Sequence, residues 1–300
     1  MNKSFTLIEI LVVIVVIGII SSFIIVGLSS VSDKANIAKG QAFSNSLRNS
    51  LLMNLVSEWK LDEGTGSTTL DSWGSNTGTL GTSTIGDAAE PTWIADCVSG
   101  KCLSFDGTDD YIEIANNSML QPRDAITIST WVKIIAYPAA QASIIDKGNS
   151  AIPYIDYRLR IRLDGKIAWE LGDGTSDSGT NFLSNSSLAI NKWYNVVVNY
   201  NKVSRNIYIN GVFDNTNSSF VSQIGARSNN LQIGRHMGGN YCFSGILDEI
   251  QFYNSSVSTN QIQERYFVGI NKLFKNNEIA LNEFNERITS LKLNLSQLGF

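Results

Sequence analysis

Hydrophobic and polar positions follow three different patterns along the chain. An uncharged and mostly apolar run extends from Ile10 to Ser32, and an apolar stripe at helical spacing continues to about residue 57. From Trp59 onward the pattern alternates with a period of two, and turn residues recur about every 8–12 residues. After Ser258 a helical period returns. These patterns predict a long N-terminal helix, a β-rich middle and a C-terminal helix.

The first apolar run is long enough to cross a membrane, since about 20 apolar helical residues span the hydrocarbon core. It fits a conventional secretory signal poorly, because the run is too long and no A-x-A site follows it. Glu9 at its head is unusual, because a carboxylate there is costly unless a cation pairs with it. A single helix over residues 5–57 would be about 80 Å long, so its second half is expected to pack on a domain.

Two turns predict how strands pair in the β-rich middle. Asn210-Gly211 is typical of a two-residue type I′ turn, and Leu163-Asp164-Gly165 of a three-residue loop with a left-handed glycine. The second loop predicts two buried cross-strand pairs and one outward ion pair: Ile161 with Ile167, Leu159 with Trp169, and Arg158 with Glu170. The spacing of strands and turns indicates an antiparallel β-sandwich, with jelly-roll connectivity as the common large form.

Composition and charge exclude several classes of function. The net charge of −4 offers no basic footprint, so nucleic-acid binding is not expected. His236 is the only histidine, which removes most histidine-based catalysis and most zinc sites. Three cysteines fit neither a disulfide-dense miniprotein nor a Cys₄ zinc site.

The cysteines nevertheless predict one disulfide. A two-residue turn at Ser99-Gly100 would place Cys97 and Cys102 opposite each other, within bonding reach. Such a bond requires an oxidising, extracytoplasmic compartment. Cys242 is expected to be a small buried residue in a strand.

The segment Lys3-Ser4-Phe5-Thr6-Leu7-Ile8-Glu9 precedes the β-branched apolar run and Gly18. In order and spacing it resembles the N-terminus of type IV prepilins and type II secretion pseudopilins, over residues 1–57. The resemblance implies a leader of residues 1–4, cleavage between Ser4 and Phe5 by a prepilin peptidase, and methylation of the new amino terminus. It also implies that Glu9 pairs with the Phe5 ammonium of a neighbouring pilin subunit, which offsets the cost of burying either charge alone. Ser4 stands where the family usually has glycine.

A second resemblance covers residues 57–267. It is carried by ordered blocks, among them Leu61-Asp62-Glu63-Gly64, Leu103-Ser104-Phe105-Asp106-Gly107, Ile128-Ser129-Thr130-Trp131-Val132, Lys192-Trp193-Tyr194, Leu231-Gln232-Ile233-Gly234 and Gly245-Ile246-Leu247-Asp248-Glu249-Ile250. These blocks resemble a LamG-like domain of the concanavalin jelly-roll superfamily. The resemblance implies extracellular recognition, often of glycans and frequently in adhesion, and it implies no reaction.

Three carboxylates are candidate calcium ligands. Asp106, Asp109 and Asp110 lie in one tight loop and supply the hard oxygen donors that Ca²⁺ prefers. The alternative is that they cap turns by accepting backbone N–H groups. No cofactor is required by the chain, and calcium remains one hypothesis for this loop. Asp62 and Asp248 belong to the first and last strands, which the family places near one another.

Neither catalysis nor a ligand site is specified by the sequence. Asp248 and Glu249 are adjacent on a strand and are expected to point to opposite faces, so they cannot form a glycosidase pair. We therefore expect no enzyme activity. Two tryptophans are expected in the core and four aromatic residues in exposed loops: Trp131 and Trp193, and then Trp73, Trp93, Tyr137 and Tyr154.

The C-terminal tail predicts one amphipathic helix. Ser258 to Gln261 form a capping box that opens a helix. Beyond it, one face repeats at 4-3 spacing: Ile270, Phe274, Asn277, Leu281, Phe284, Ile288, Leu291, Leu295 and Leu298. Two packing partners remain open, this chain's own sandwich or first helix, and another subunit.

The sequence thus predicts a leader (1–4), a transmembrane and assembly helix (5–57), a LamG-like jelly roll (58–267) and a C-terminal amphipathic helix (268–300). The expected protein is a pilin-like subunit, single-pass in the cytoplasmic membrane before assembly and then part of an extracellular filament. Its outer domain would bind a glycan or protein ligand. The alternatives are a pseudopilin of a type II secretion-like machine and a membrane-anchored glycan-active enzyme.

Overall fold

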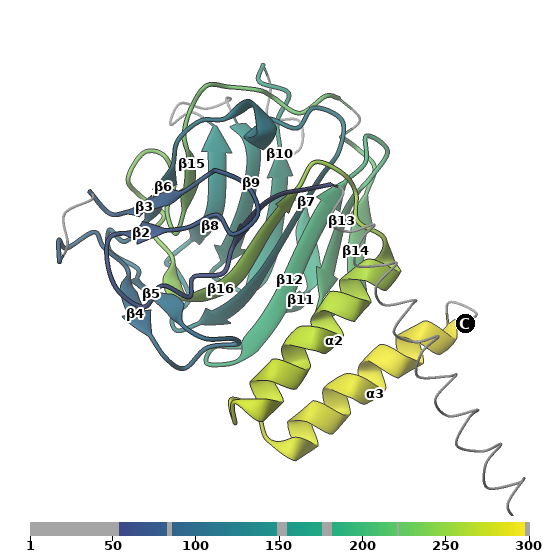
Figure 1. Cartoon of the computed structure of the whole chain (residues 1–300). Helices are drawn as coiled ribbons and strands as arrows, with labels where there is room; N and C mark the ends of the chain where they lie inside the picture. Colours follow the sequence, from purple (N-terminus) through teal and green to yellow (C-terminus); the bar gives the residue numbers. More distant parts are fainter. Residues whose placement is uncertain (1–53, 83–85, 149–154, 176–181, 221, 298–300) are drawn as a thin grey trace, which may run out of the picture. The chain divides into compact units, whose positions relative to one another are not determined.

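The structure, a computed structural model, describes residues 54–82, 86–148, 155–175, 182–220 and 222–297 (Figure 1). The predictions for Ser4, Phe5 and Glu9 lie outside these ranges. Within them, no helix combines the length and the apolar character needed to cross a membrane.

Two eight-stranded antiparallel sheets form a β-sandwich, as predicted (Figure 1). Sheet A runs in the order β14 (Val212–Asn217), β13 (Arg205–Ile209), β12 (Trp193–Tyr200), β7 (Ile126–Ile134), β16 (Ser244–Tyr253), β5 (Cys102–Asp106) and β4 (Thr92–Ile94), with β1 (Leu55–Trp59) also paired to β16. Sheet B runs in the order β11 (Leu183–Ser187), β10 (Lys166–Leu171), β9 (Ile155–Arg162), β8 (Gln141–Gly148), β15 (Leu231–Ile233), β6 (Ile112–Ile114), β3 (Gly78–Leu80) and β2 (Thr68–Thr69).

The main hydrophobic core lies between the two sheets, because every second residue of each strand points to the same face. Both predicted turns are present. Asn210 and Gly211 have φ of 54° and 74°, as a type I′ turn requires, and Gly165 has φ of 76°. The predicted register also holds: Ile161 lies opposite Ile167, Leu159 opposite Trp169, and Arg158 opposite Glu170.

The N-terminal boundary differs from the prediction. Leu55 to Ser57, expected at the end of the first helix, belong to β1, which pairs antiparallel with β16 from Leu55–Tyr253 to Trp59–Ile250. The helical spacing of the apolar residues therefore ends earlier, because the backbone here finds hydrogen-bonding partners 190 or more residues away in the sequence.

The described residues from Asn54 onward form one compact unit. Both hydrophobic clusters of the described residues, one between the sheets and one under the C-terminal helices, belong to this unit. This unit therefore has the core of its own that an independently folding domain needs.

The tail forms two helices where the sequence predicted one. Helix α2 (Thr259–Lys275) begins at the predicted capping box, with Ser258 and Gln261 bonded reciprocally. It ends in a Schellman motif, in which Asn277 N donates to Phe274 O and Glu278 N donates to Leu273 O (3.2 and 3.0 Å). Asn277 has φ of 61°, and helix α3 (Leu281–Gln297) follows. Asn277, the one polar residue of the face with 4-3 spacing, is thus the left-handed residue that ends α2.

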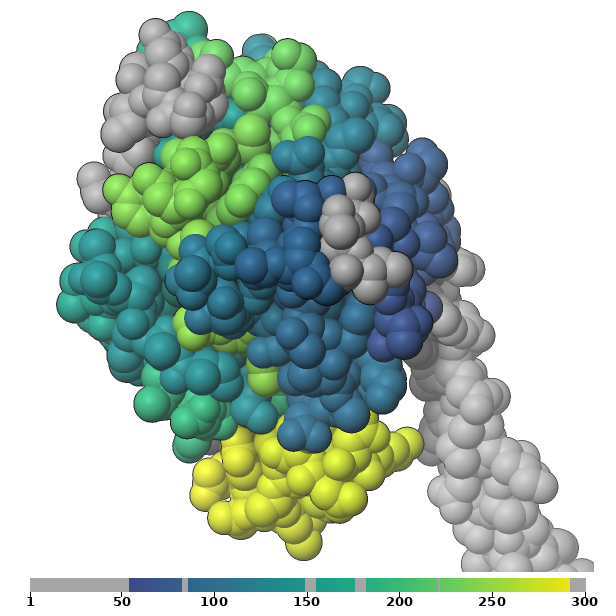
Figure 2. Space-filling view, turned by 90° about the vertical axis from the view of Figure 1, so that its left-hand side faces the viewer, coloured from purple at the N-terminus to yellow at the C-terminus, as the bar shows by residue number. Residues whose placement is uncertain are grey.

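The tail packs on its own sandwich, which was one of the two predicted partners. Helix α2 covers the outer face of sheet A, where Trp131, Trp193 and Ile246 form a second core with Tyr266 and Ile270. Leu291 of α3 is buried in the same cluster. Figure 2 shows the yellow C-terminal segment below the β-sandwich.

Candidate ligand-binding sites

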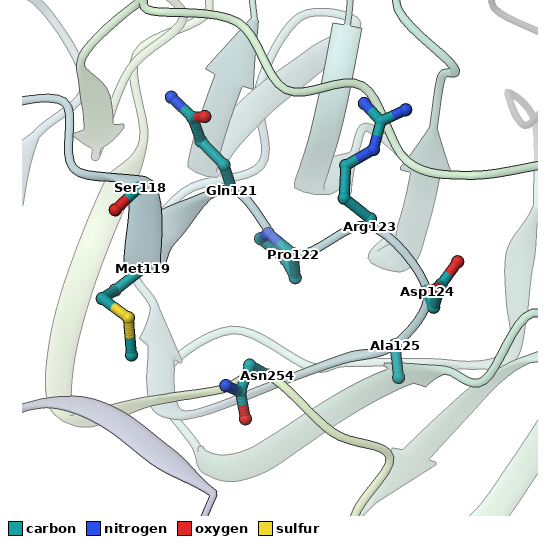
Figure 3. Close-up of a pocket in the computed structure, with 8 residues that line it drawn as sticks. All are labelled: Ser118, Met119, Gln121, Pro122, Arg123, Asp124, Ala125 and Asn254. Atoms are coloured by element: carbon teal, nitrogen blue, oxygen red, sulfur yellow. The ribbon is translucent and has the colours of Figure 1, made fainter.

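A pocket of about 300 Å³ opens beside the connection between β6 and β7. Its lining is Ser118, Met119, Gln121, Pro122, Arg123, Asp124, Ala125 and Asn254. In Figure 3, Met119, Pro122, Ala125 and Asn254 surround the opening, while the side chains of Gln121 and Arg123 extend away from it. This volume is at the lower end of the range for small-molecule sites.

The 3₁₀ turn η1 (Ser118–Leu120) positions one wall of the pocket. Asn117 caps the turn by accepting from Met119 N at 2.9 Å. Leu120 is fully buried, and its carbonyl accepts from the Tyr157 hydroxyl at 3.0 Å. Met119 is thereby held on the outside, 52% exposed.

The opposite wall is held by polar contacts. Asp124 accepts from Lys202 Nζ and from Gln223 Nε2, both at 3.0 Å. These two hydrogen bonds lower the pKa of Asp124 below its ordinary value. Gln223 also accepts from Arg123 at 3.1 Å, so one amide fixes both charged residues. The pocket therefore combines one hydroxyl group, two amides and the oppositely charged Arg123 and Asp124 with three apolar side chains, a set that suits an uncharged polar ligand.

The pocket adjoins the point where the chain enters the compact unit. Asn254, which lines it, donates through its backbone N–H to Asn54 O at 3.2 Å. Sequence reasoning missed this site, because its residues come from one loop and from a distant strand end. The sequence gives only a weak signal, the run of polar residues around Pro122 ahead of β7.

The three predicted calcium ligands do come together. Carboxylate oxygens of Asp106, Asp109 and Asp110 all lie within 4.8 Å of one another. Asp106 accepts from Thr108 N, and Asp110 accepts from Asp106 N, both at 2.7 Å. Burial, together with the negative charges of Asp106 and Asp109, raises the pKa of Asp110 to about 6. The loop thus has the hydrogen bonds expected if the aspartates cap turns. It also concentrates negative charge, and a bound cation would reduce the repulsion between the carboxylates.

Asp62 and Asp248 do not join that cluster among the described residues. They lie at the loop between β4 and β5, where Asp248 accepts from Ser99 N at 3.0 Å and Asp62 from Lys101 N at 2.9 Å. Burial holds the pKa of Asp248 well above its ordinary value. Glu249 instead pairs with Lys272 of α2 at 2.7 Å. The adjacent carboxyl groups of Asp248 and Glu249 therefore have different partners, the β4–β5 loop and helix α2.

Cys97 and Cys102 form a disulfide, with their Cα atoms 5.6 Å apart. The predicted two-residue turn is wrong, because Cys102 pairs with Ile94 across the β4–β5 hairpin and the loop covers residues 95–101. The loop packs into the second core, where Val98 is fully buried and its carbonyl accepts from Asn276 Nδ2 at 3.1 Å. Cys242 is only half-buried and precedes β16, so the strand prediction for it is also wrong.

The loop aromatics differ in how far they are exposed. Trp73 is 47% and Tyr137 is 43% exposed, whereas Trp93 packs partly against the core and donates to Gly66 O at 2.9 Å. Tyr154 lies outside the described residues. Trp131 and Trp193 are buried as expected, but under α2 and not between the sheets.

A row of buried charges crosses the outer face of sheet B. Arg158 Nε lies 2.8 Å from Asp146 Oδ2, and Arg160 Nη1 lies 3.3 Å from Glu170 Oε2. The predicted Arg158–Glu170 register is right, but the predicted ion pair is not, because Arg158 pairs with Asp146 and Glu170 pairs with Arg160. All four residues are at most 5% exposed. The alternating arginines of β9 were the signal in the sequence for this row of charges. Nothing in the sequence indicated that the row would be buried.

His236 lies over this row. Its Nε2 is 3.0 Å from Arg158 Nη2, and its Nδ1 accepts from Gly238 N at 3.0 Å. Burial and the charges of Arg158 and Arg160 lower its pKa to about 4. His236 is therefore neutral at pH 7, and its contacts are those of a residue that closes a loop over buried arginines.

Comparison with known families identifies both parts of the chain. Residues 106–263 match the concanavalin A-like lectin/glucanases superfamily, and residues 1–25 match the prokaryotic N-terminal methylation motif. No curated protein matches the chain.

Solved structures share the fold of the sandwich at low sequence identity. Domain 4 of AbnA, an extracellular arabinanase of Geobacillus stearothermophilus solved with arabinotriose, is 17% identical (TM-score 0.55), with 70% of this chain and 97% of that one covered. The binding domain of Paraclostridial Mosquitocidal Protein 1 is 14% identical (TM-score 0.58; 74% and 53% covered). The binding domain of botulinum neurotoxin serotype D is 17% identical (TM-score 0.55; 73% and 52% covered). This chain thus spans about half the length of the two toxin domains.

The family match extends from the carboxylate loop at Asp106 into α2, over both sheets of the sandwich. The chain belongs to the concanavalin A-like lectin/glucanases superfamily and carries a prokaryotic N-terminal methylation motif ahead of its lectin-like unit.

Proposed function

We propose that this protein is a pilin-like subunit of a type IV pilus or related filament that presents a glycan-binding domain outside the cell. The observation that carries the proposal is the order of the two parts. A methylation motif occupies residues 1–25, and a compact lectin-like unit follows from residue 54. A prepilin peptidase would cut between Ser4 and Phe5, and Glu9 would pair with the Phe5 ammonium of a neighbour.

The glycan would occupy the pocket at Ser118 to Ala125 and Asn254. Sugars offer hydroxyl groups to polar side chains and C–H faces to apolar ones, and the pocket supplies both, with the exposed Met119 as the main apolar contact. The similarity to an arabinanase domain solved with arabinotriose makes that trisaccharide the first probe.

Filament assembly is tested on the full-length protein in its native host. We expect mass spectrometry to find methylated Phe5 at the amino terminus, and immunogold labelling to place the sandwich on filaments. Glu9→Ala should remove the protein from filaments and leave the Cys97–Cys102 disulfide intact in the membrane fraction. Normal incorporation of Glu9→Ala would refute the assembly role.

Glycan binding is tested by calorimetry with arabinotriose and by a glycan array. Met119→Ala and Asn254→Ala should each weaken the binding of any glycan found by about fivefold or more, which corresponds to about 1 kcal/mol. Leu70→Ala is the matched control, since Leu70 is 57% exposed and lies outside the pocket. Equal binding by all three variants would show that the glycan binds at another site. No hydrolysis product is expected in any mixture.

One observation favours a second function, that of a secretion pseudopilin whose sandwich binds other machine components. The pocket adjoins Asn54, the end of the unit that continues into residues 1–53, so a neighbouring subunit could cover it. The two functions predict different outcomes for Met119→Ala. A machine component loses assembly or secretion, whereas a glycan-binding pilin loses only glycan binding.

A further inference from the structure

The loop between β7 and β8 is apolar and exposed along its length. Residues 135–140 read Ile-Ala-Tyr-Pro-Ala-Ala, and the Tyr137 hydroxyl is their only polar side-chain group. Ile135 is 42% and Tyr137 is 43% exposed, and Pro138 alone is half-buried. Such a run is costly to leave in water unless a partner covers it.

Two neighbouring loops extend this apolar surface. Leu163, at the β9–β10 turn, is 54% exposed, and Ile190, before β12, is 43% exposed. We name residues 135–140, Leu163, Ala189 and Ile190 the apolar pole.

Hydrogen bonds hold the three loops together. Tyr137 Oη donates to Leu188 O at 2.8 Å, and Leu163 N donates to Ala140 O at 3.0 Å. Asn191 N also donates to Ile134 O at 2.7 Å. The apolar side chains are therefore presented on a fixed backbone frame, which reduces the loop ordering that a partner has to offset.

The charge around the pole is opposite to that of the chain as a whole. The stretches 162–166 and 188–192 contain Arg162, Lys166 and Lys192 against a single acid, Asp164, while the protein carries a net charge of −4. Lys192 is exposed, and Arg162 and Lys166 are half-buried at the rim. A partner that matches this arrangement is apolar inside and negatively charged at its surface.

The apolar pole and Asn54, the first described residue, lie at opposite ends of the sandwich. Thr127, at the start of β7, pairs with Tyr253, whose neighbour Asn254 contacts Asn54. The apolar loop follows Ile134, the other end of β7. Ile134 is eight residues beyond Ile126, which is about 27 Å along the strand at 3.3–3.4 Å per residue. The pole and the pocket are thus separate surfaces.

We propose that the apolar pole docks on an anionic lipid bilayer. Aliphatic and tyrosine side chains would enter the boundary between headgroups and acyl chains, and the three basic residues would lie at the headgroup charges. The proposal does not depend on glycan binding or on filament assembly.

The test is co-sedimentation of residues 54–300 with two kinds of vesicle, phosphatidylcholine alone and phosphatidylcholine with an equal part of phosphatidylglycerol. Binding is expected to the anionic vesicles and to weaken with salt. Leu163→Asp with Ile190→Asp should lower the partition coefficient at least about tenfold. Lys166→Gln and Lys192→Gln should each lower it about fivefold.

Two substitutions elsewhere serve as controls. Val203→Asp changes a residue that is 67% exposed in the β12–β13 turn, and Lys60→Gln removes a surface charge away from the pole. Both should bind vesicles as the unaltered protein does, and all variants should keep the same unfolding midpoint. Absence of binding by the unaltered protein, or equal binding by the Leu163→Asp, Ile190→Asp double variant, would overturn the proposal. Sedimentation velocity gives a second way to overturn it. If the unaltered protein is a dimer that binds no vesicles, and the double variant is a monomer, the apolar pole is a dimer interface.

Discussion

The indole of Trp131 stacks on the ring of Tyr266, with 5.7 Å between ring centroids and 21° between planes. Trp131 lies on the outer face of sheet A and Tyr266 on α2. Gly269, one turn further along α2, faces the same indole, and a Cβ there would lie 2.3 Å from Trp131 Cζ2. The close approach of the helix to the sheet therefore depends on this glycine.

Replacing Gly269 by alanine sets two effects against each other. Helix propensity alone would stabilise the protein by about 1 kcal/mol. Overpacking against Trp131 costs about 1–3 kcal/mol and is expected to exceed that gain, because the ring is held between the sheet and Tyr266. Urea unfolding should show a net loss of stability. Val268→Ala, on the exposed side of α2, should change little, and a more stable Gly269→Ala protein would contradict the packing argument.

Asn277 is expected to tolerate glycine and to reject valine. The left-handed conformation after α2 suits glycine, whereas a β-branched residue there costs about 1–2 kcal/mol or more. If residues 268–300 were one continuous helix in solution, the order would reverse and Asn277→Gly would be the damaging change. Thermal unfolding of the two variants decides between these arrangements.

The disulfide is expected to stabilise the second core. Non-reducing mass spectrometry should find Cys97 joined to Cys102 and Cys242 as a free thiol. Replacing both bonded cysteines by alanine should cost about 2 kcal/mol, since the closed loop is short. Cys242→Ala is the control and should leave the unfolding midpoint nearly unchanged. Three free thiols in the native protein would refute the pairing.

The Asp146–Arg158 pair should show strong coupling. Arg158→Met would leave the Asp146 carboxyl group buried without its closest cation and should cost about 3–5 kcal/mol. Asp146→Leu combined with Arg158→Met should cost clearly less than the two single changes added together. Additive losses in this double-mutant cycle would mean that the pair contributes only through packing.

Asp110 should make stability depend on pH near 6. Its pKa is raised to about 6 in the folded protein from an ordinary value of 3.8, so the folded state favours the protonated carboxyl group. The resulting penalty is complete above pH 6 and disappears as the pH falls toward 4. Asp110→Asn should therefore gain stability relative to the unaltered protein at pH 7 and lose that advantage at pH 4.

The same carboxylates give a test for calcium. If Asp106, Asp109 and Asp110 hold Ca²⁺, millimolar-range calcium should raise the unfolding temperature at pH 7, and a chelator should reverse the rise. Asp109→Asn should reduce the effect. Calcium that leaves the unaltered protein unchanged would assign the loop to turn capping alone.

Local patterns in the sequence determined much of the fold. Asn210-Gly211 and Gly165 predicted their turns and register, because these residues adopt positive φ at little cost. The Ser258–Gln261 capping box predicted where α2 begins, because both hydrogen bonds form within four residues. The period of two predicted which side chains of β9 and β10 face the core.

The tertiary structure decided the features that depend on distant partners. Leu55 to Ser57 are a strand because β16 accepts them as a neighbour, and Asn277 ends a helix because α3 folds back beside α2. Arg158 and Arg160 are buried because the loop carrying His236 covers them, and Trp131 and Trp193 form a second core because α2 lies over sheet A. The sequence by itself specified the geometry of the two predicted turns and of the start of α2, because their hydrogen bonds form between near neighbours. Which face of a strand or helix is covered was decided by segments tens to hundreds of residues away, whose contacts leave no periodic signal.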